Sequence, residues 1–99
     1  MTDYPTSDQL AQIEAWPAKD PTGWLAFVKS CWYAADWGWS EDTEIGDGGQ
    51  PRRYYRISTA GSSDNEWIIA AMRRNVILWA TTWYSSRRGG HYEFRVEGR

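Results

Sequence analysis

Cysteine and lysine are scarce in this sequence, and it contains no long apolar run. The single cysteine, Cys31, excludes an internal disulfide framework and is typical of a protein from a reducing compartment. No stretch approaches the roughly 20 apolar residues of a membrane span. The first residues, MTDYPTSDQLAQIE, lack the apolar centre of a secretory signal. We therefore expect a soluble, cytoplasmic protein with no membrane partner.

Histidine is equally scarce, and this argues against a metal centre or an enzyme. One histidine and one cysteine do not make a zinc site, and EDTEIGDGG lacks the spacing of a calcium loop. His91 has Glu93 two residues away and follows Ser85 and Ser86, which are residue types of nucleophilic catalysis. No nucleophile elbow, paired-carboxylate motif or phosphate-binding loop accompanies them. We expect a strand histidine beside a turn, with no catalysis, no cofactor and no metal.

Charge is divided unevenly along the chain. Residues 1–51 hold two lysines and nine acidic residues, a formal charge of −7, whereas residues 52–99 hold nine arginines and four acidic residues, a charge of +5. Two interpretations stay open. Either the halves pack together and neutralise one another in part, or the arginines form a surface for an acidic partner.

Aromatic residues are unusually frequent. The chain of 99 residues contains eight tryptophans, six tyrosines and two phenylalanines. Tryptophan fills cores but is also enriched in binding surfaces. A domain of this size does not bury eight indoles, so we expect one or two of them on the surface.

Two patterns predict helices in the first part of the chain. Thr6 and Gln9 have the spacing of a capping box, and the helix of about 7–15 should end before Pro17. A second helix has Asp20 as its cap and continues to about Gly38. Its buried stripe comprises Trp24, Leu25, Val28, Cys31, Trp32 and Ala35.

The middle of the chain predicts two strands and a third helix. GDGGQP separates an acidic segment of about 39–45, which also suits a loop, from a stronger strand of about 52–59. Ser63 and Glu66 have capping-box spacing, and Asn75 can end that helix in the left-handed conformation. Its expected buried face is Trp67, Ile68, Ala71 and Met72.

The end of the chain predicts an antiparallel hairpin. VILWATTWYSS could continue the preceding helix, but its β-branched and aromatic residues favour a strand. HYEFRVE alternates between apolar and polar residues, and Gly89 and Gly90 supply the positive φ angles of a tight turn. The polar side of the last strand is either covered in part by the acidic helices, which we favour, or left as an exposed aromatic patch with charged residues around it.

These elements predict one α+β domain over residues 1–99. Two N-terminal helices occupy 7–36, and a small, mostly antiparallel sheet of three or four strands occupies 37–99, with one helix before the C-terminal hairpin.

Residues 59–94 resemble a family of short, uncharacterised phage and prophage proteins with the signature NE…W…W..SRRGGHY.F. The chain departs from the family pattern at Ala60, Ser62 and Asp64, where the family has Gly, Trp and Gly. The resemblance implies a bacterial host cell as the setting but implies no activity. The matching residues are Thr59, Gly61, Ser63, Asn65, Glu66, Ile69, Ala71, Asn75, Trp79, Trp83, Ser86, Arg87, Arg88, Gly89, Gly90, His91, Tyr92 and Phe94.

A turn does not require Arg87 and Arg88, so these arginines are the best candidates for a binding role. The predicted contact surface comprises Arg87, Arg88, His91 and Arg95, with Trp79 or Trp83 as an aromatic anchor. We expect a non-enzymatic phage accessory protein that binds a host or phage protein, in its specific form an inhibitor of a host defence or regulatory complex.

Three alternatives remain for the partner and the surface. The acidic first half could make the contact by mimicking the phosphates of nucleic acid. The arginine and aromatic surface could instead bind nucleic acid or an anionic nucleotide, although the sequence pI of about 5.3 argues against this. A homodimer is also compatible with an exposed apolar sheet surface.

Overall fold

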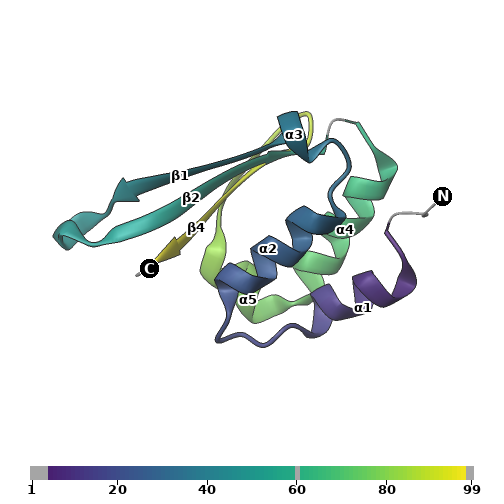
Figure 1. The fold of residues 1–99 in the computed structure, drawn as a ribbon, viewed down its shortest axis with the longest axis horizontal. Coiled ribbons are helices and arrows are strands. Elements are labelled where there is room, and N and C mark those ends of the chain that lie inside the picture. The colour runs from purple at the N-terminus through teal and green to yellow at the C-terminus, as the bar shows by residue number, and fades with distance from the viewer. Residues whose placement is uncertain (1–4, 60, 98–99) are drawn as a thin grey trace.

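The computed structural model describes residues 5–59 and 61–97 and has two layers, a four-stranded antiparallel sheet and a group of helices on one of its faces (Figure 1). This is the predicted α+β fold. The helices are α1 (Ser7–Ala15), α2 (Pro21–Cys31), α3 (Ala35–Gly38), α4 (Ser63–Arg74) and α5 (Val76–Thr82). The strands are β1 (Trp39–Ile45), β2 (Pro51–Ser58), β3 (Trp83–Arg87) and β4 (His91–Glu97), with a short 3₁₀ turn η1 (Asp47–Gly49).

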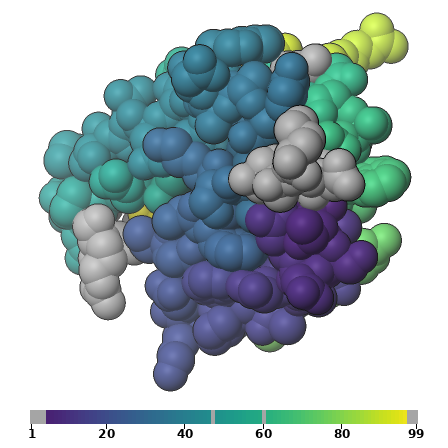
Figure 2. All heavy atoms as spheres, turned by 45° about the vertical axis from the view of Figure 1, so that its right-hand side comes forward, coloured from purple at the N-terminus to yellow at the C-terminus, as the bar shows by residue number. Residues whose placement is uncertain are grey.

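The strand order in the sheet is β1-β2-β4-β3, so the β1–β2 and β3–β4 hairpins join through β2 and β4. In Figure 1 the β1–β2 hairpin extends beyond the helices at one end. Figure 2 shows the helical side, where α1 (purple) and α2 (blue) form a continuous surface. None of the helices in the described ranges is long and apolar enough to cross a membrane.

The first two helices begin as the sequence predicts. Thr6 and Gln9 form a reciprocal capping box, in which the Gln9 backbone N–H donates to Thr6 Oγ1 at 3.1 Å and the Thr6 N–H donates to Gln9 Oε1 at 2.9 Å. The Asp20 carboxylate accepts the Gly23 N–H at 3.1 Å, and Pro21 occupies the first turn of α2. These side chains satisfy N–H groups that have no partner within the helix.

The second helix is shorter than predicted, and a contact from α4 explains why. α2 ends at Cys31, and Ala34 adopts a φ of 61° before the short α3 begins. The buried amide of Asn65 accepts the Tyr33 N–H at 2.9 Å and donates to the Tyr33 carbonyl at 3.0 Å. This pair of hydrogen bonds replaces those that a longer helix would make and directs the chain towards the sheet.

The cap of α4 lies one residue before the predicted one. Ser62 is the capping residue, and its Oγ accepts the Asn65 N–H at 3.4 Å. Ser63 is therefore the first helical residue, and the expected capping box with Glu66 is not formed. Trp67 is 59% exposed rather than buried. The buried residues of α4 (Asn65, Ile68, Ile69, Ala71 and Met72) form a stripe with helical spacing, and Trp67 lies outside it.

Residues 76–82 form α5 and not the predicted strand, and Asn75 accounts for the difference. Asn75 has a φ of −83°, not the predicted left-handed conformation. Its Oδ1 accepts the Leu78 N–H at 3.5 Å, so it ends α4 and caps a new helix. Leu78 and Thr82 point into the interior one turn apart, while Val76 and Ile77 remain exposed. Asn75 Nδ2 also donates to the carbonyls of Ile13 and Trp16, and this tertiary anchoring overrides the β propensity of residues 76–82.

The core lies between the helices and one face of the sheet. Phe94 and Val96 of β4 and Tyr55 and Ile57 of β2 are buried on this face. The prediction that the acidic helices partly cover the polar side of β4 is wrong, because the helices pack on its apolar side (Figure 1). Burying one apolar side chain stabilises the fold by about 1.5–3 kcal/mol, and helices packed on the polar side of β4 would not gain this stabilisation. The core residues on the helices are Ile13, Trp24, Leu25, Val28, Cys31, Ile68, Ile69, Ala71, Met72 and Leu78.

Candidate binding face of the sheet

The face of the sheet opposite the core carries polar and aromatic side chains. Antiparallel pairing places them in rows across the strands, one row joining Asp42, Tyr54 and Arg95, and the next Ser40, Arg56, Glu93 and Ser85. A further row joins Ser58, His91 and Arg87. We call this surface the open face, because α1, α2, α4 and α5 lie on the other side (Figure 1). The open face comprises Ser40, Asp42, Glu44, Arg52, Tyr54, Arg56, Ser58, Tyr84, Ser85, Arg87, His91, Glu93 and Arg95.

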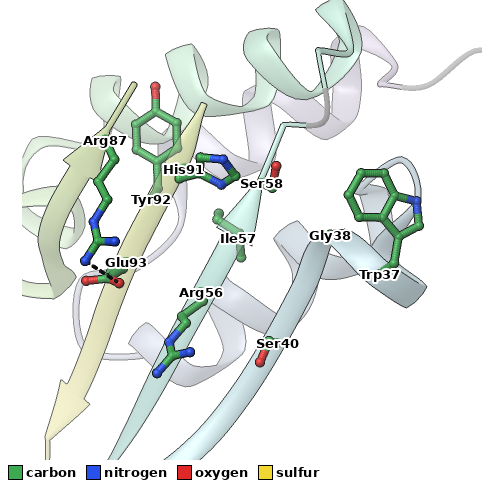
Figure 3. A pocket seen from close by; sticks show the side chains of 10 residues that line it. All are labelled: Trp37, Gly38, Ser40, Arg56, Ile57, Ser58, Arg87, His91, Tyr92 and Glu93. Atoms are coloured by element: carbon green, nitrogen blue, oxygen red, sulfur yellow. Dashed lines mark ion pairs between the residues drawn. The ribbon is translucent and has the colours of Figure 1, made fainter. Parts of the chain in front are cut away.

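A pocket of about 410 Å³ lies at the end of the open face beside α3. Trp37 of α3 forms one side, and Arg87 and His91 of the β3–β4 hairpin lie across from it (Figure 3). Arg56 and Glu93 lie in the same view on β2 and β4. The Trp37 side chain is 68% exposed, so its indole is available to a ligand. The pocket thus combines an aromatic surface with two guanidinium groups.

Glu93 is the carboxylate of the pocket, and Ser85 is its main partner. Ser85 Oγ donates to Glu93 Oε1 at 2.7 Å, and this hydrogen bond is the largest of the effects that lower the pKa of Glu93. Arg87 Nη2 lies 3.8 Å from Glu93 Oε2 (dashed line in Figure 3), which is too long for a hydrogen bond. The hydrogen bond from Ser85 thus favours the ionised form of Glu93, and Arg87 is held only loosely.

Arginine and tyrosine side chains stack along the open face next to the pocket. The guanidinium carbons of Arg56 and Arg95 each lie 5.1 Å from the centre of the Tyr54 ring. Arg95 also lies 3.6 Å from the centre of the Tyr84 ring, and its Nε forms a 3.1 Å ion pair with Glu44 that falls short of hydrogen-bond geometry. Cation–π contacts of this kind contribute about 0.5–1 kcal/mol at exposed sites and hold the side chains in place.

The two glycines of the β3–β4 turn position Arg87 and His91. Gly89 and Gly90 have φ angles of 87° and 79°, as the sequence predicts for this turn. The Thr59 N–H donates to the Gly90 carbonyl at 2.9 Å, and a Cβ on Gly90 would overlap with Thr59 Oγ1. The turn is thereby fixed against the end of β2. Arg88 belongs to the turn itself and is exposed.

The structure divides the predicted contact residues between two sides of the sheet. Arg87, His91 and Arg95 lie on the open face. Trp79 lies on the core side, where its ring packs 5.4 Å from Phe94 and the Arg73 guanidinium lies 5.2 Å above it. Trp83 is 42% exposed at the edge, and its Nε1 donates to Ser86 Oγ at 2.8 Å. The predicted surface is therefore not one continuous patch.

The predicted contacts leave out several residues of the open face and its pocket, among them Trp37, Tyr54, Arg56 and Tyr84. Tyr54 and Arg56 alternate with buried Tyr55 and Ile57, and this alternation was legible in the sequence. Tyr84 lies at a register shift between Trp83 and Ser85, which the sequence does not signal. Trp37 reaches the pocket because the chain turns at Ala34.

Ion pairs link the acidic and the arginine-rich halves of the chain. They join Arg52 to Glu44 at 2.8 Å, Arg53 to Glu41 at 3.2 Å, Arg74 to Glu14 at 3.1 Å and Arg95 to Glu44 at 3.1 Å. The two halves therefore neutralise one another in part, which is the first of the two interpretations of the charge asymmetry. Arg87, by contrast, has its 3.8 Å contact within its own hairpin.

Comparison with known proteins adds no further assignment. No protein-family model matches the sequence, and neither the curated proteins nor the solved structures give a significant match. Over the described residues, no group of three or more histidine, cysteine, aspartate or glutamate side chains is arranged to hold a metal ion. The open face therefore stands as the candidate site on its own geometry.

Proposed function

We infer that this protein binds another protein through the open face of its sheet. The observation that carries this proposal is a sheet face that α1, α2, α4 and α5 leave uncovered, where Tyr54 and Tyr84 lie among arginines and Trp37 of α3 is exposed beside them. Tryptophan, tyrosine and arginine are the residues most enriched among those that dominate protein–protein binding energy. Trp37 and Tyr84 are 68% and 50% exposed, so their apolar surface would be buried on association.

The mixed charge of the open face favours a protein over a nucleic acid. Asp42, Glu44 and Glu93 lie among the arginines on neighbouring strands. Strands are about 4.8 Å apart, so a chain of phosphates that crosses the sheet would meet carboxylates as well as guanidinium groups. A protein binds nucleic acid mainly through many arginine and lysine side chains that no neighbouring carboxylate neutralises. A protein partner can instead match both signs of charge.

The resemblance of residues 59–94 to phage and prophage proteins supports a partner inside a bacterial cell. Within this proposal, the partner is a host or phage protein, and inhibition of a host defence or regulatory complex is the specific role. Contact through the acidic first half is the competing form of the same proposal. The two forms differ in which surface variants abolish capture.

The test is capture of partners from a bacterial lysate by the tagged protein, with and without nuclease, followed by mass spectrometry. The decisive comparison is Trp37→Ala against Trp67→Ala. Both tryptophans are mostly exposed, but Trp67 lies on α4, away from the open face. We expect the wild type and Trp67→Ala to capture a partner protein even after nuclease treatment, and Trp37→Ala to fail to capture it.

Two other results would contradict the proposal. Equal capture by both tryptophan variants, combined with loss on charge reversal at Asp8 and Glu14 of α1, would move the contact to the acidic half. Recovery of nucleic acid, with all captured proteins lost after nuclease treatment, would replace protein binding by nucleic-acid binding.

A further inference from the structure

We propose that the pocket beside Trp37 receives an acidic side chain of the partner protein together with an adjacent aromatic side chain. This proposal rests on the proposed function and specifies the partner's contact segment. The carboxylate would lie between Arg56 and Arg87, and the aromatic ring would pack on Trp37.

The charge of the pocket favours an anion. Two guanidinium groups, those of Arg56 and Arg87, and the imidazole of His91 line the pocket, and Glu93 is the one carboxylate among its lining residues. The side chain of Glu93 is only 14% exposed, whereas that of Arg87 is 73% exposed. An approaching group therefore meets the arginines before it meets the carboxylate. Two permanent positive charges against one negative charge leave a net attraction for an anion.

The arginines retain hydrogen-bonding capacity for a ligand. Glu93 already accepts the Ser85 hydroxyl at 2.7 Å, and Arg87 stands 3.8 Å from its other oxygen. Arg87 can thus turn to a new carboxylate while Glu93 keeps its Ser85 partner. Arg56 lies against the Tyr54 ring, which orients the plane of its guanidinium group. An oriented guanidinium binds a carboxylate through two parallel hydrogen bonds at small entropic cost.

The apolar side of the pocket favours an aromatic neighbour for that carboxylate. Trp37 lies across the pocket from Arg87 and His91 (Figure 3). Gly38 lets α3 approach the sheet, because a Cβ there would lie 3.1 Å from the Ser58 carbonyl oxygen. The volume of about 410 Å³ is at the lower end of small-ligand pockets, which span about 300–1,000 Å³. It suits one aromatic side chain and one carboxylate better than an extended polymer.

The test is an NMR titration of the ¹⁵N-labelled protein with phenylacetate, using phenethylamine as a control of similar size and opposite charge. We expect phenylacetate to shift the Trp37 indole N–H and the backbone signals of Ser58 and His91, and phenethylamine to leave them in place. Arg87→Glu should weaken phenylacetate binding about tenfold or more, because it removes a charge-assisted contact. Arg88→Glu, the neighbouring turn arginine, should change it less than about twofold. The ¹⁵N spectrum of each variant confirms its fold.

Three outcomes would overturn this inference. They are shifts of equal size with phenethylamine, no shift with either probe, and stronger binding of a short oligothymidylate at the same signals. The lysate experiment separates this failure from failure of the proposed function. If Arg87→Glu still captures the partner and Trp37→Ala does not, the result supports protein binding through the open face and contradicts the carboxylate contact.

Discussion

Asn75 Nδ2 donates a hydrogen bond to the carbonyl oxygen of Ile13 at 3.0 Å, across 62 positions of the chain. The same nitrogen also donates to the Trp16 carbonyl at 3.1 Å. The end of α1 and the junction of α4 with α5 are therefore joined by one buried amide. Because its Oδ1 caps α5 at Leu78, the side chain fixes both the packing of the helices and the start of α5.

We expect Asn75→Ala to lower the free energy of unfolding by about 2–4 kcal/mol, because the Trp16 carbonyl loses its Asn75 donor, the Ile13 carbonyl keeps only that of Trp24 Nε1, and α5 loses its cap. Urea denaturation followed by circular dichroism measures this change. Asn75→Asp is the informative companion. It keeps the cap oxygen but sets a carboxylate against two carbonyls, so it should destabilise the protein at least as much. A loss below about 1 kcal/mol in both variants would contradict the role given to Asn75.

The glycines of the β3–β4 turn should respond differently to substitution. A positive φ costs an alanine about 1–2 kcal/mol, and Gly90→Ala adds overlap with Thr59 Oγ1, which costs about 1–3 kcal/mol more. Gly89→Ala has only an ordinary contact, 3.5 Å from the His91 ring. Thermal unfolding should therefore show a larger loss for Gly90→Ala.

Thr59 provides the control for the Gly90 prediction. Its Oγ1 is buried without a hydrogen-bond partner in the described part of the chain, so Thr59→Ala removes the overlapping atom at little cost. The double variant Thr59→Ala/Gly90→Ala should recover part of the stability that Gly90→Ala loses. If Gly89→Ala and Gly90→Ala are equally stable, the close approach of Gly90 to Thr59 does not affect the stability of the variants.

Substitution of Trp79 and of Trp83 should affect stability differently, because Trp79 packs in the fold and Trp83 lies at the surface. Trp79 packs on Phe94 and Tyr92 and lies beneath Arg73, whereas Trp83 is 42% exposed. We expect Trp79→Ala to cost about 2–4 kcal/mol, at the low end for a large aromatic because the ring is only partly buried. Trp83→Ala should cost about 1 kcal/mol. Urea denaturation of both variants measures the difference, and similar losses would contradict this assignment.

The elements that the sequence predicts well are those whose signals are local. The caps of α1 and α2 lie within four residues of the groups they satisfy, and the alternation of β4 identifies its buried face directly. The sequence predicts a strand in place of α5, because the carbonyls that hold Asn75 lie at the end of α1, far away in the sequence. Local propensity cannot detect such an anchor.

The candidate site follows the same division. Arg87 and His91 flank a turn that is visible in the sequence, and the sequence predicts both as contact candidates. Trp37 reaches the pocket because Asn65 of α4 holds the Tyr33 backbone and so ends α2 early. A contact between residues 32 positions apart leaves no periodic pattern. The aromatic half of the pocket therefore emerges only from the folded chain.

The Ser85–Glu93 hydrogen bond should make stability depend on pH in a defined direction. It is the main cause that lowers the pKa of Glu93 from its usual value of 4.5, so its contribution is complete above that value and is lost as the pH falls through the lowered pKa. Ser85→Ala should raise the pKa of Glu93 and cost about 1 kcal/mol at neutral pH, but almost nothing near pH 2. Carboxyl ¹³C titration and urea denaturation at both pH values measure these effects. Ser86→Ala, which loses only the contact with Trp83, should leave the Glu93 titration unchanged. An equal stability loss at both pH values for Ser85→Ala would show that the hydroxyl contributes through packing and not through the carboxylate.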